Sequence, residues 1–245
     1  MNTTTNKTCL VYQPLGLGDI IWVQPIIDTI ISDGYEVYYP VGDVYYDIVS
    51  SYIKKKNLNW VKESAEFPLK QYYGQVNFHQ SENELYVPLS YADRYLPQSS
   101  VMISKYYFLS IPIRDYRKSF SLKRNYEREN KLMQTYGLVE DYIIVNNSFG
   151  TNSQQRDIVI NSDSKVHYMN IAQDKDNGFH IFDWIMALEN AKEIHTVETS
   201  LCYLIDKYCL TNDIHMYEKR TSSQPNTYYN NVNLVYRNPN WIYEN

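Results

Sequence analysis

The feature that most constrains this chain is a strand, a glycine turn, a helix and a second strand that follow one another almost without linkers. Residues 9–12 form a short apolar run, and the turn at 16–18 leads into apolar positions at helical spacing. That helical pattern stops at 33–34, and residues 36–41 follow as a second strand. Because so short a connection forces a right-handed parallel crossover, the chain is predicted to open a doubly wound α/β sheet.

A second α/β pattern begins past the middle of the chain. Residues 142–146 form an apolar strand, and residues 179–190 carry apolar side chains at the spacing of an amphipathic helix. Another strand is expected at 193–197, followed by a helix at 201–208. Further elements are expected as helices at 45–55 and 124–136 and as strands at 59–61, 85–89, 165–171, 214–217 and 232–236.

Two domains account for this repetition. The chain has 245 residues, enough for two compact domains that each bury a core. The charged helix at 124–136 leads out of the first pattern, so we place the boundary there. The predicted domains are 1–130 and 131–245.

Charge and hydropathy exclude several classes of protein. With 23 basic and 28 acidic residues the chain has no overall basic field to hold nucleic acid. The longest apolar stretches fall short of the ~20 residues that a spanning helix needs. Residues 1–8 are polar and lack the apolar core of a signal peptide. We therefore expect a cytoplasmic protein with no nucleic-acid partner and no transmembrane segment.

The three cysteines fit the same location. Cys9, Cys202 and Cys209 are odd in number and lack the spacing of metal ligands, as expected in a reducing compartment. Cys9 and Cys202 lie in apolar surroundings, so they are predicted to be small buried side chains rather than reactive groups.

Asp19 stands at the mouth of the first glycine turn, where a helix begins. A dinucleotide-binding fingerprint would need a third glycine where Ile21 stands, which disfavours a nicotinamide enzyme. The Asp19 carboxylate has two other uses. It could cap the helix, or it could face an interdomain cleft as a general base.

Two blocks of the sequence resemble one enzyme family. The segment 14–21, Pro-Leu-Gly-Leu-Gly-Asp-Ile-Ile, with Gln-Pro-Ile-Ile at 24–27, resembles the opening of the lipopolysaccharide heptosyltransferase-type glycosyltransferases. The segments 182–192 and 194–201 are similar to that family's later helix, strand and D-T-G-L-x-H-L loop. The two blocks occur in the family's order.

The resemblance implies a fold and an activity. The fold would be two Rossmann-like domains facing across a cleft (GT-B type), here shortened, with the acceptor held by the first domain and a nucleotide-sugar by the second. The chemistry would be inverting transfer of a sugar to a glycan or lipid-linked acceptor, with no cofactor and no required metal. A non-catalytic nucleotide-sugar or glycan-binding module of the same fold is the alternative. A trimmed version carried by a virus or phage would account for the brevity of the chain.

The resemblance also assigns roles to residues. Asp19 matches the catalytic aspartate, with Gly16 and Gly18 forming the turn that presents it. The positions that meet the donor diphosphate are Glu198, Thr199, Ser200 and Leu201. The chain departs from the family by a Glu for Asp at 198, a Ser for Gly at 200 and a Tyr for His at 203. Residues 198–200 could equally be an ordinary helix cap.

The polar loop after the strand at 142–146 is the second predicted part of the donor site. Its polar and glycine residues are Asn146, Asn147, Ser148, Gly150, Gln155 and Arg156. The Arg156 guanidinium could hold a diphosphate through two hydrogen bonds without a metal, or it could be a solvated loop charge. Lys165 is the reserve candidate. His180 opens the amphipathic helix and could contact the donor or serve as a capping or surface residue.

Acidic residues could suggest a metal site instead. Asp43, Asp47 and Asp93 do not form a D-x-D in an apolar-flanked turn, and hard cations need several converging oxygens. We therefore predict no metal.

Overall fold

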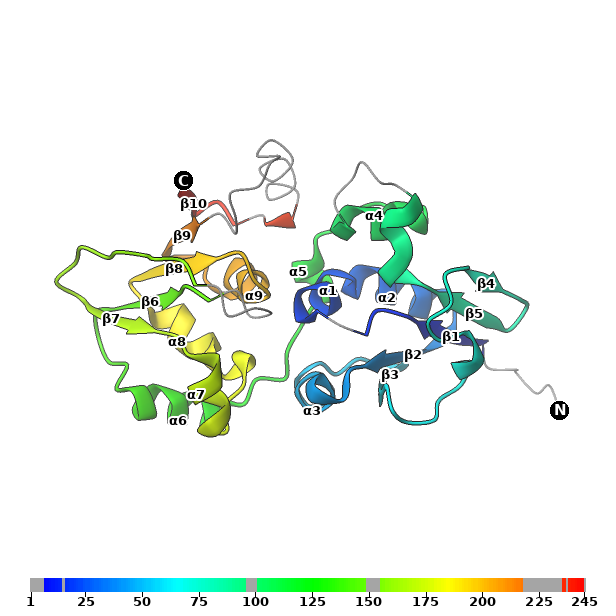
Figure 1. Cartoon of the computed structure of the whole chain (residues 1–245), viewed down its shortest axis with the longest axis horizontal. Helices are drawn as coiled ribbons and strands as arrows, with labels where there is room; N and C mark the ends of the chain where they lie inside the picture. The colour runs from blue at the N-terminus through cyan, green and yellow to red at the C-terminus, as the bar shows by residue number, and fades with distance from the viewer. Residues whose placement is uncertain are drawn as a thin grey trace. The chain divides into compact units, whose positions relative to one another are not determined.

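The computed structural model describes residues 7–14, 16–95, 101–148, 155–217, 235–236 and 238–244. The chain divides into two compact units, Met1–Lys123 and Arg124–Asn245, and each has its own sheet (Figure 1). The boundary lies a few residues before the predicted one, because helix α6 (Tyr126–Tyr136) packs on the second unit. Arg128 of this helix forms an ion pair with Asp183 at 2.7 Å, which ties α6 to the second unit.

The first unit is a half-Rossmann sheet with strand order β3-β2-β1-β5-β4, in which only β4 runs antiparallel. Its strands are β1 (Lys7–Val11), β2 (Tyr35–Val41), β3 (Leu58–Lys62), β4 (His79–Gln80) and β5 (Glu84–Val87). Its helices are α1 (Leu17–Trp22), α2 (Gln24–Ser32), α3 (Asp43–Tyr52), α4 (Val101–Phe108) and α5 (Tyr116–Ser119), with 3-10 turns η1 (Lys70–Tyr72) and η2 (Leu89–Tyr95). The last three residues of β1 are fully buried, as expected for a central parallel strand covered on both faces.

The first helix of the predicted pattern is two helices in the structure. Pro25 has no N–H and cannot continue the backbone ladder, so α1 ends at Trp22 and α2 begins at Gln24. The side-chain Nε2 of Gln24 donates to the Ile20 carbonyl at 2.9 Å, so this carbonyl keeps a hydrogen-bond partner where the helix breaks. The prediction of one continuous helix was therefore wrong at Val23.

The second unit is an all-parallel sheet with strand order β10-β9-β8-β6-β7. Its strands are β6 (Tyr142–Asn146), β7 (Lys165–Tyr168), β8 (Glu193–Val197), β9 (Asp213–Tyr217) and β10 (Trp241–Glu244). Besides α6, its helices are α7 (Ile171–Asp176), α8 (Ile185–Asn190) and α9 (Leu201–Tyr208), with a 3-10 turn η3 (Ile181–Trp184). The strand order reverses between β6 and β8, and such a switch point is where open parallel sheets bind ligands.

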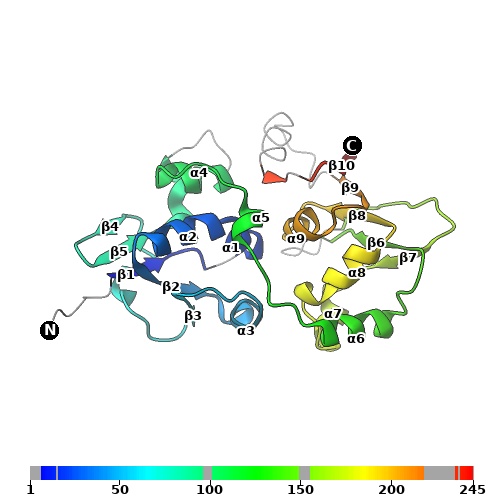
Figure 2. The ribbon, with the colours of Figure 1, turned by 180° about the vertical axis from the view of Figure 1, so that it is seen from behind.

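The two faces of the second sheet are covered differently. The face that carries Tyr142 packs against α8, where the Tyr142 hydroxyl donates to the Ala187 carbonyl at 2.7 Å, and α8 and α9 lie side by side (Figure 2). On the opposite face, Ile143, Val145 and Val197 pack against Ile158, which follows the polar loop. In the described part of the chain a loop segment covers this face where a helix would be usual.

Several predicted elements are confirmed, and others are corrected. The strands at 142–146 and 193–197 and the helix at 201–208 have the predicted bounds. The strand expected at 165–171 ends at Tyr168, and Ile171 begins α7. The strand expected at 232–236 lies mostly outside the described residues, and its described end is not strand. Helices α4, α5 and α7 and strand β10 were not predicted. None of the described helices is long and apolar enough to cross a membrane.

Candidate functional site

The first half of the site is the turn after β1. Gly16 adopts a left-handed φ of +86°, which favours glycine. A Cβ atom at position 16 would also run into Oδ2 of Asp19. Gly18 lies one residue before Asp19 inside the first turn of α1. Gly16 is therefore required twice, for its backbone conformation and for the space that it leaves to the Asp19 carboxylate.

The Asp19 carboxylate forms an ion pair with Lys105 of α4. The Lys105 side chain is 1% exposed and that of Asp19 is 26% exposed. A lysine is almost never buried without a partner, because removing an ammonium from water is costly. The N-cap of α1 is Gly16, and no side chain caps this helix. The structure thus gives Asp19 an ion pair and not the capping role that the sequence left open.

Helix α4 is held where Lys105 can reach Asp19. The indole Nε1 of Trp22 donates to the Met102 carbonyl at 2.7 Å, and the Tyr106 hydroxyl donates to the Trp22 carbonyl at 2.7 Å. Sequence analysis missed Lys105. The available signal was that Lys105 is the one charged residue of α4, whose other side chains are apolar or weakly polar.

A phenol lies near the same carboxylate. Tyr39 of β2 is fully buried, and its hydroxyl has no hydrogen-bond partner among the described residues. Burial, followed by the charge of Asp19 and the neighbouring Tyr73, holds the pKa of Tyr39 well above its usual value. Tyr39 therefore stays a neutral phenol close to Asp19.

The second half of the site is the switch point between β6 and β8. Asn146, 3% exposed, ends β6 and donates from Nδ2 to Thr196 Oγ1 at 3.0 Å and to Thr199 Oγ1 at 3.2 Å. Thr199 Oγ1 also accepts from the Leu201 backbone N–H at 3.3 Å. These uncharged groups link the carboxyl ends of β6 and β8 to the start of α9.

The predicted cap of α9 is made by one of its three candidates. Thr199 supplies a side-chain oxygen to the first turn, whereas Ser200 is the N-cap by backbone position and makes no side-chain cap bond. Glu198 is half-buried beside them.

Burial, with a smaller contribution from the Glu198 charge, raises the pKa of Cys202 to about 12, so this thiol stays protonated. All three cysteines are free. Cys9 and Cys202 are buried, as predicted, and Cys209 is buried too.

The polar loop after β6 brings Arg156 back to the sheet. The Arg156 backbone N–H donates to the Asn147 carbonyl at 3.0 Å, and Ser148 forms an isolated antiparallel bridge with Gln155. The Arg156 guanidinium lies 5.3 Å from the ring centroid of Tyr217, at the end of β9. Gly150 lies outside the described residues. Arg156 is thus stacked on an aromatic ring.

Two further candidates have structural partners. Lys165 donates from Nζ to the Gly137 carbonyl at 2.7 Å, at the carboxyl end of α6, where a cation is favoured. The backbone N–H of His180 donates to Asp183 Oδ2 at 2.8 Å, at the start of η3. For His180, this is the capping arrangement that the sequence weighed against a donor contact.

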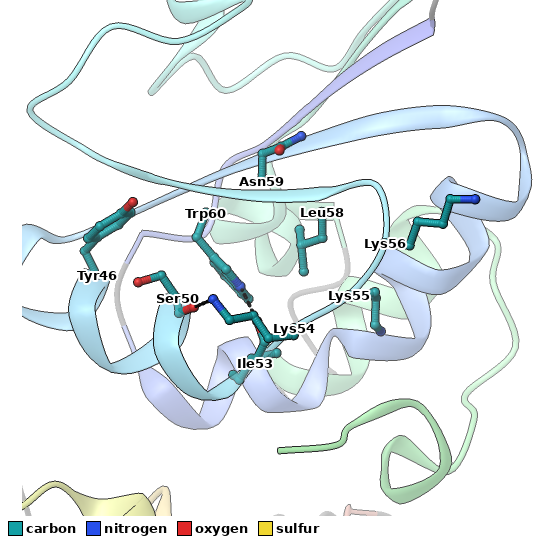
Figure 3. A pocket seen from close by; sticks show the side chains of 9 residues that line it. All are labelled: Tyr46, Ser50, Ile53, Lys54, Lys55, Lys56, Leu58, Asn59 and Trp60. Atoms are coloured by element: carbon teal, nitrogen blue, oxygen red, sulfur yellow. Dashed lines mark hydrogen bonds between the residues drawn. The ribbon is translucent and has the colours of Figure 1, made fainter. Parts of the chain in front are cut away.

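A hollow of about 430 Å³ in the first unit lies elsewhere (Figure 3). It is formed by the end of α3 and the start of β3, at the amino edge of the sheet. Its polar groups are used within the fold, since Lys54 bonds to the Ser50 carbonyl and Trp60 Nε1 donates to the Ile53 carbonyl at 2.9 Å. Ligands of parallel sheets bind at the carboxyl edge, so this hollow is not the candidate site.

Comparison with known proteins gives matches in structure only. No protein-family model and no curated protein matches the chain. A crystal structure of a glycosyl transferase of family 9 from Veillonella parvula DSM 2008 aligns over 97% of this chain and 85% of its own, at 10% identity and a TM-score of 0.52. The iron-containing dodecameric glycosyltransferase TibC from enterotoxigenic E. coli H10407 aligns over 100% of this chain and 64% of its own, at 9% identity and a TM-score of 0.52.

The chain has the heptosyltransferase-like GT-B fold. In this GT-B fold, Asp19 follows β1, the central strand of the first sheet, and Asn146 ends β6, which is next to β8, the central strand of the second. The predicted fold class is confirmed at the level of the two α/β units. The cleft between the domains stays a prediction.

Proposed function

We propose that the chain is an inverting glycosyltransferase that moves a sugar from a nucleotide-sugar to a hydroxyl acceptor. The observation that carries the proposal is the Asp19 turn. A glycine with left-handed backbone geometry and a buried lysine hold one partly exposed carboxylate at the carboxyl edge of a parallel sheet. A sheet of the GT-B fold binds its ligands at that edge.

In the proposed reaction, Asp19 accepts the proton of the acceptor hydroxyl as the oxygen attacks the anomeric carbon. The new bond forms on one face of the sugar while the bond to the diphosphate breaks on the other, which inverts the anomeric centre. Lys105 pairs with Oδ1 of Asp19 and so orients the carboxylate. A base placed in this way contributes about 10²–10⁴ to the rate.

The second unit would hold the donor and take up the charge of the leaving nucleoside diphosphate. The start of α9 supplies the positive end of a helix dipole, and Thr199 and Asn146 supply neutral polar groups beside it. Arg156 supplies the cation that replaces a metal. A structure of TibC holds ADP-D-β-D-heptose, and that likeness of fold, at a TM-score of 0.51, supports a nucleotide-sugar as the donor here.

The remaining parts of the proposal follow the sequence. The acceptor is a glycan or a lipid-linked sugar, transfer needs no cofactor and no metal, and the protein acts in the cytoplasm. His180, Asn147, Ser148, Glu198, Ser200 and Leu201 stay predicted donor residues.

The Asp19–Lys105 pair also favours a second candidate, a nucleotide-sugar-binding module without turnover. A carboxylate committed to a buried ammonium can be a structural ion pair in place of a base. Such a module would bind the donor and release no nucleoside diphosphate when an acceptor is added.

A screen for donors tests the proposal. We expect the melting temperature to rise with one or a few of the UDP-, GDP-, ADP- and CMP-sugars, because a ligand that binds only the folded state stabilises it. The donors found are then incubated with acceptor mixtures, and release of the nucleotide is measured, a diphosphate from UDP-, GDP- and ADP-sugars and a monophosphate from CMP-sugars. Binding with release supports the enzyme, binding without release supports the module, and stabilisation by NAD(P) alone contradicts both.

A further inference from the structure

One face of the second sheet carries polar side chains where a parallel sheet is usually apolar. Glu193 and His195 lie on β8, and His215 lies beside His195 on β9 in the register of the parallel pair. Strand β10 lies next to β9 (Figure 1), and its Glu244 contacts the His215 ring and so lies on the same face. Strands buried between layers normally read as continuous apolar runs, so this polar group calls for an explanation.

The group has the composition and spacing of a metal-binding cluster. One ligand atom from each of Glu193, His195 and His215 lies within 4.8 Å of the other two. His195 Nε2 is 3.4 Å from Glu193 Oε2, about the separation of two ligands around one tetrahedral zinc ion, whose bonds are about 2.0–2.2 Å long. The widest gap in the trio is at most 4.8 Å and exceeds that separation by up to about 1.4 Å, so the side chains must move closer together to share one ion.

Both imidazoles are already oriented by a second partner. His215 Nδ1 is 2.7 Å from Glu244 Oε1, and His195 Nδ1 is 2.9 Å from the Tyr217 hydroxyl. A metal-bound histidine almost always donates its other ring N–H to a carboxylate or another oxygen, which fixes the tautomer. With Nδ1 of each ring so engaged, Nε2 of each is the nitrogen that remains to bind a cation.

We propose that Glu193, His195 and His215 bind one divalent transition-metal ion, with Zn²⁺ as the preferred ion. Two imidazole nitrogens and one carboxylate suit Zn²⁺ and leave a fourth position for water, whereas Mg²⁺ and Ca²⁺ prefer sets of oxygen ligands. The side chains of His195 and His215 are 8% and 20% exposed, so the ion enters a largely desolvated site. It joins β8 to β9, and through Glu244 to β10.

The metal cluster adjoins one part of the proposed donor site and is separated from another. Successive side chains of a strand point to opposite faces, so His195 and Thr196 lie on opposite faces of β8. Asn146 bonds to Thr196 on one face, and the metal cluster occupies the other. Arg156 stacks on Tyr217, whose hydroxyl contacts His195, so Arg156 lies beside the cluster. We assign the ion a structural role, and no step of the proposed transfer passes through it.

The test is Zn²⁺ binding to the full chain after chelator treatment, measured by calorimetry and by the melting temperature. We expect one Zn²⁺ per chain and a higher melting temperature. Glu193→Gln and His215→Gln remove proposed ligands, so each should weaken binding at least as much as loss of a residue that orients a ligand does, about 10–100-fold. The matched control is His79→Gln, because His79 lies 3.7 Å from Glu84 on the first unit as a histidine–glutamate pair without a second imidazole, and it should leave affinity unchanged.

Co²⁺ gives a readout that does not depend on stability. Bound by two imidazoles and a carboxylate, it should show a visible d–d absorption band that Zn²⁺ abolishes stoichiometrically. The band should be lost in Glu193→Gln, which keeps the shape of the side chain and preserves the fold. Absence of stoichiometric Zn²⁺ binding, or binding that Glu193→Gln and His215→Gln leave unchanged, would overturn the proposal.

Discussion

The two units are each built on a five-stranded, mainly parallel sheet and differ in the side chains at its carboxyl edge. In the first unit that edge carries a charged pair, Asp19 with the buried Lys105. In the second unit it carries the uncharged Asn146 and Thr199 at the start of a helix. Some ion pairs of the second unit, such as Arg124 with Glu129, lie among its helices.

This difference shows how one fold divides a transfer reaction. A base must carry a negative charge, and a buried partner orients it. A diphosphate is best held by neutral hydrogen-bond donors, a helix start and an arginine. Ion pairs such as Arg124 with Glu129 hold the helices of the second unit together instead.

The largest expected effect comes from removing the ion-pair partner of a buried carboxylate. Arg124 bonds to Glu129, which is fully buried, and to Glu189 at 2.8 Å. Arg124→Met should destabilise the second unit by about 3–5 kcal/mol, because it leaves a buried charge unpaired. Lys105→Met should cost about 1 kcal/mol or less, since the partly exposed Asp19 remains hydrated.

Urea unfolding followed by peptide-resolved hydrogen exchange measures both changes and assigns each to a unit. Equal losses of stability in the two variants would contradict the idea that Arg124–Glu129 stabilises the fold while Lys105–Asp19 mainly serves the candidate site.

The next effect concerns the one cation expected at the donor site. Arg156→Ala should weaken nucleotide-sugar binding by about 1–3 kcal/mol if the guanidinium makes a charge-assisted contact with the diphosphate. Lys165→Ala is the control, because Lys165 bonds to carbonyls at the end of α6, and it should leave affinity unchanged. Calorimetry with the donor found in the screen measures both. An unchanged nucleotide-sugar affinity in Arg156→Ala would show that Arg156 does not bind the donor and only stacks on Tyr217.

A smaller effect separates the cap of α9 from its neighbour. Thr199→Val removes the oxygen that accepts from Leu201 N–H and Asn146 Nδ2, and should cost about 0.5–2 kcal/mol of stability. Ser200→Ala should cost almost nothing, because the Ser200 side chain makes no cap bond. Melting temperatures of the two variants test this. The opposite ranking would place the cap on Ser200.

The smallest effect is a pH dependence confined to the second unit. Burial, followed by the charge of Lys165, lowers the pKa of His167 below its usual 6.5. The unfolded chain then binds the proton more tightly, so stability is complete above about pH 6.5 and falls as the pH drops toward the folded-state pKa. In His167→Phe, the urea unfolding midpoint should fall less between pH 7 and pH 5.5 than it does in the unaltered protein. An unchanged pH profile would remove His167 as its source.

The sequence predicts the local strand-helix order well because each signal is local. The apolar run at 142–146 and the helix at 201–208 are readable from spacing alone. The break at Val23 was missed because apolar periodicity continues through Pro25. Strand β10 is four residues long, and its pairing with β9 is a long-range contact that periodicity does not encode.

The candidate site was predictable in part for the same reason. The turn motif places Asp19, but the partner Lys105 is 86 residues away in the chain, and only the packing of Trp22 on α4 brings it there. Likewise, Asn146 stands in the predicted loop, whereas its bonds to Thr196 and Thr199 depend on β6 and β8 being neighbours.

The most direct test of the central claim is the transfer rate and donor affinity of Asp19→Asn, measured on the same preparation of full-length protein. Asn keeps the shape of Asp and removes its basicity. If the first unit supplies the base and the second holds the donor, the rate should fall about 10²–10⁴-fold while donor affinity stays close to that of the unaltered protein. The melting temperature should fall as well, because the buried Lys105 loses its carboxylate partner. Full transfer activity in a well-folded Asp19→Asn protein would contradict the account.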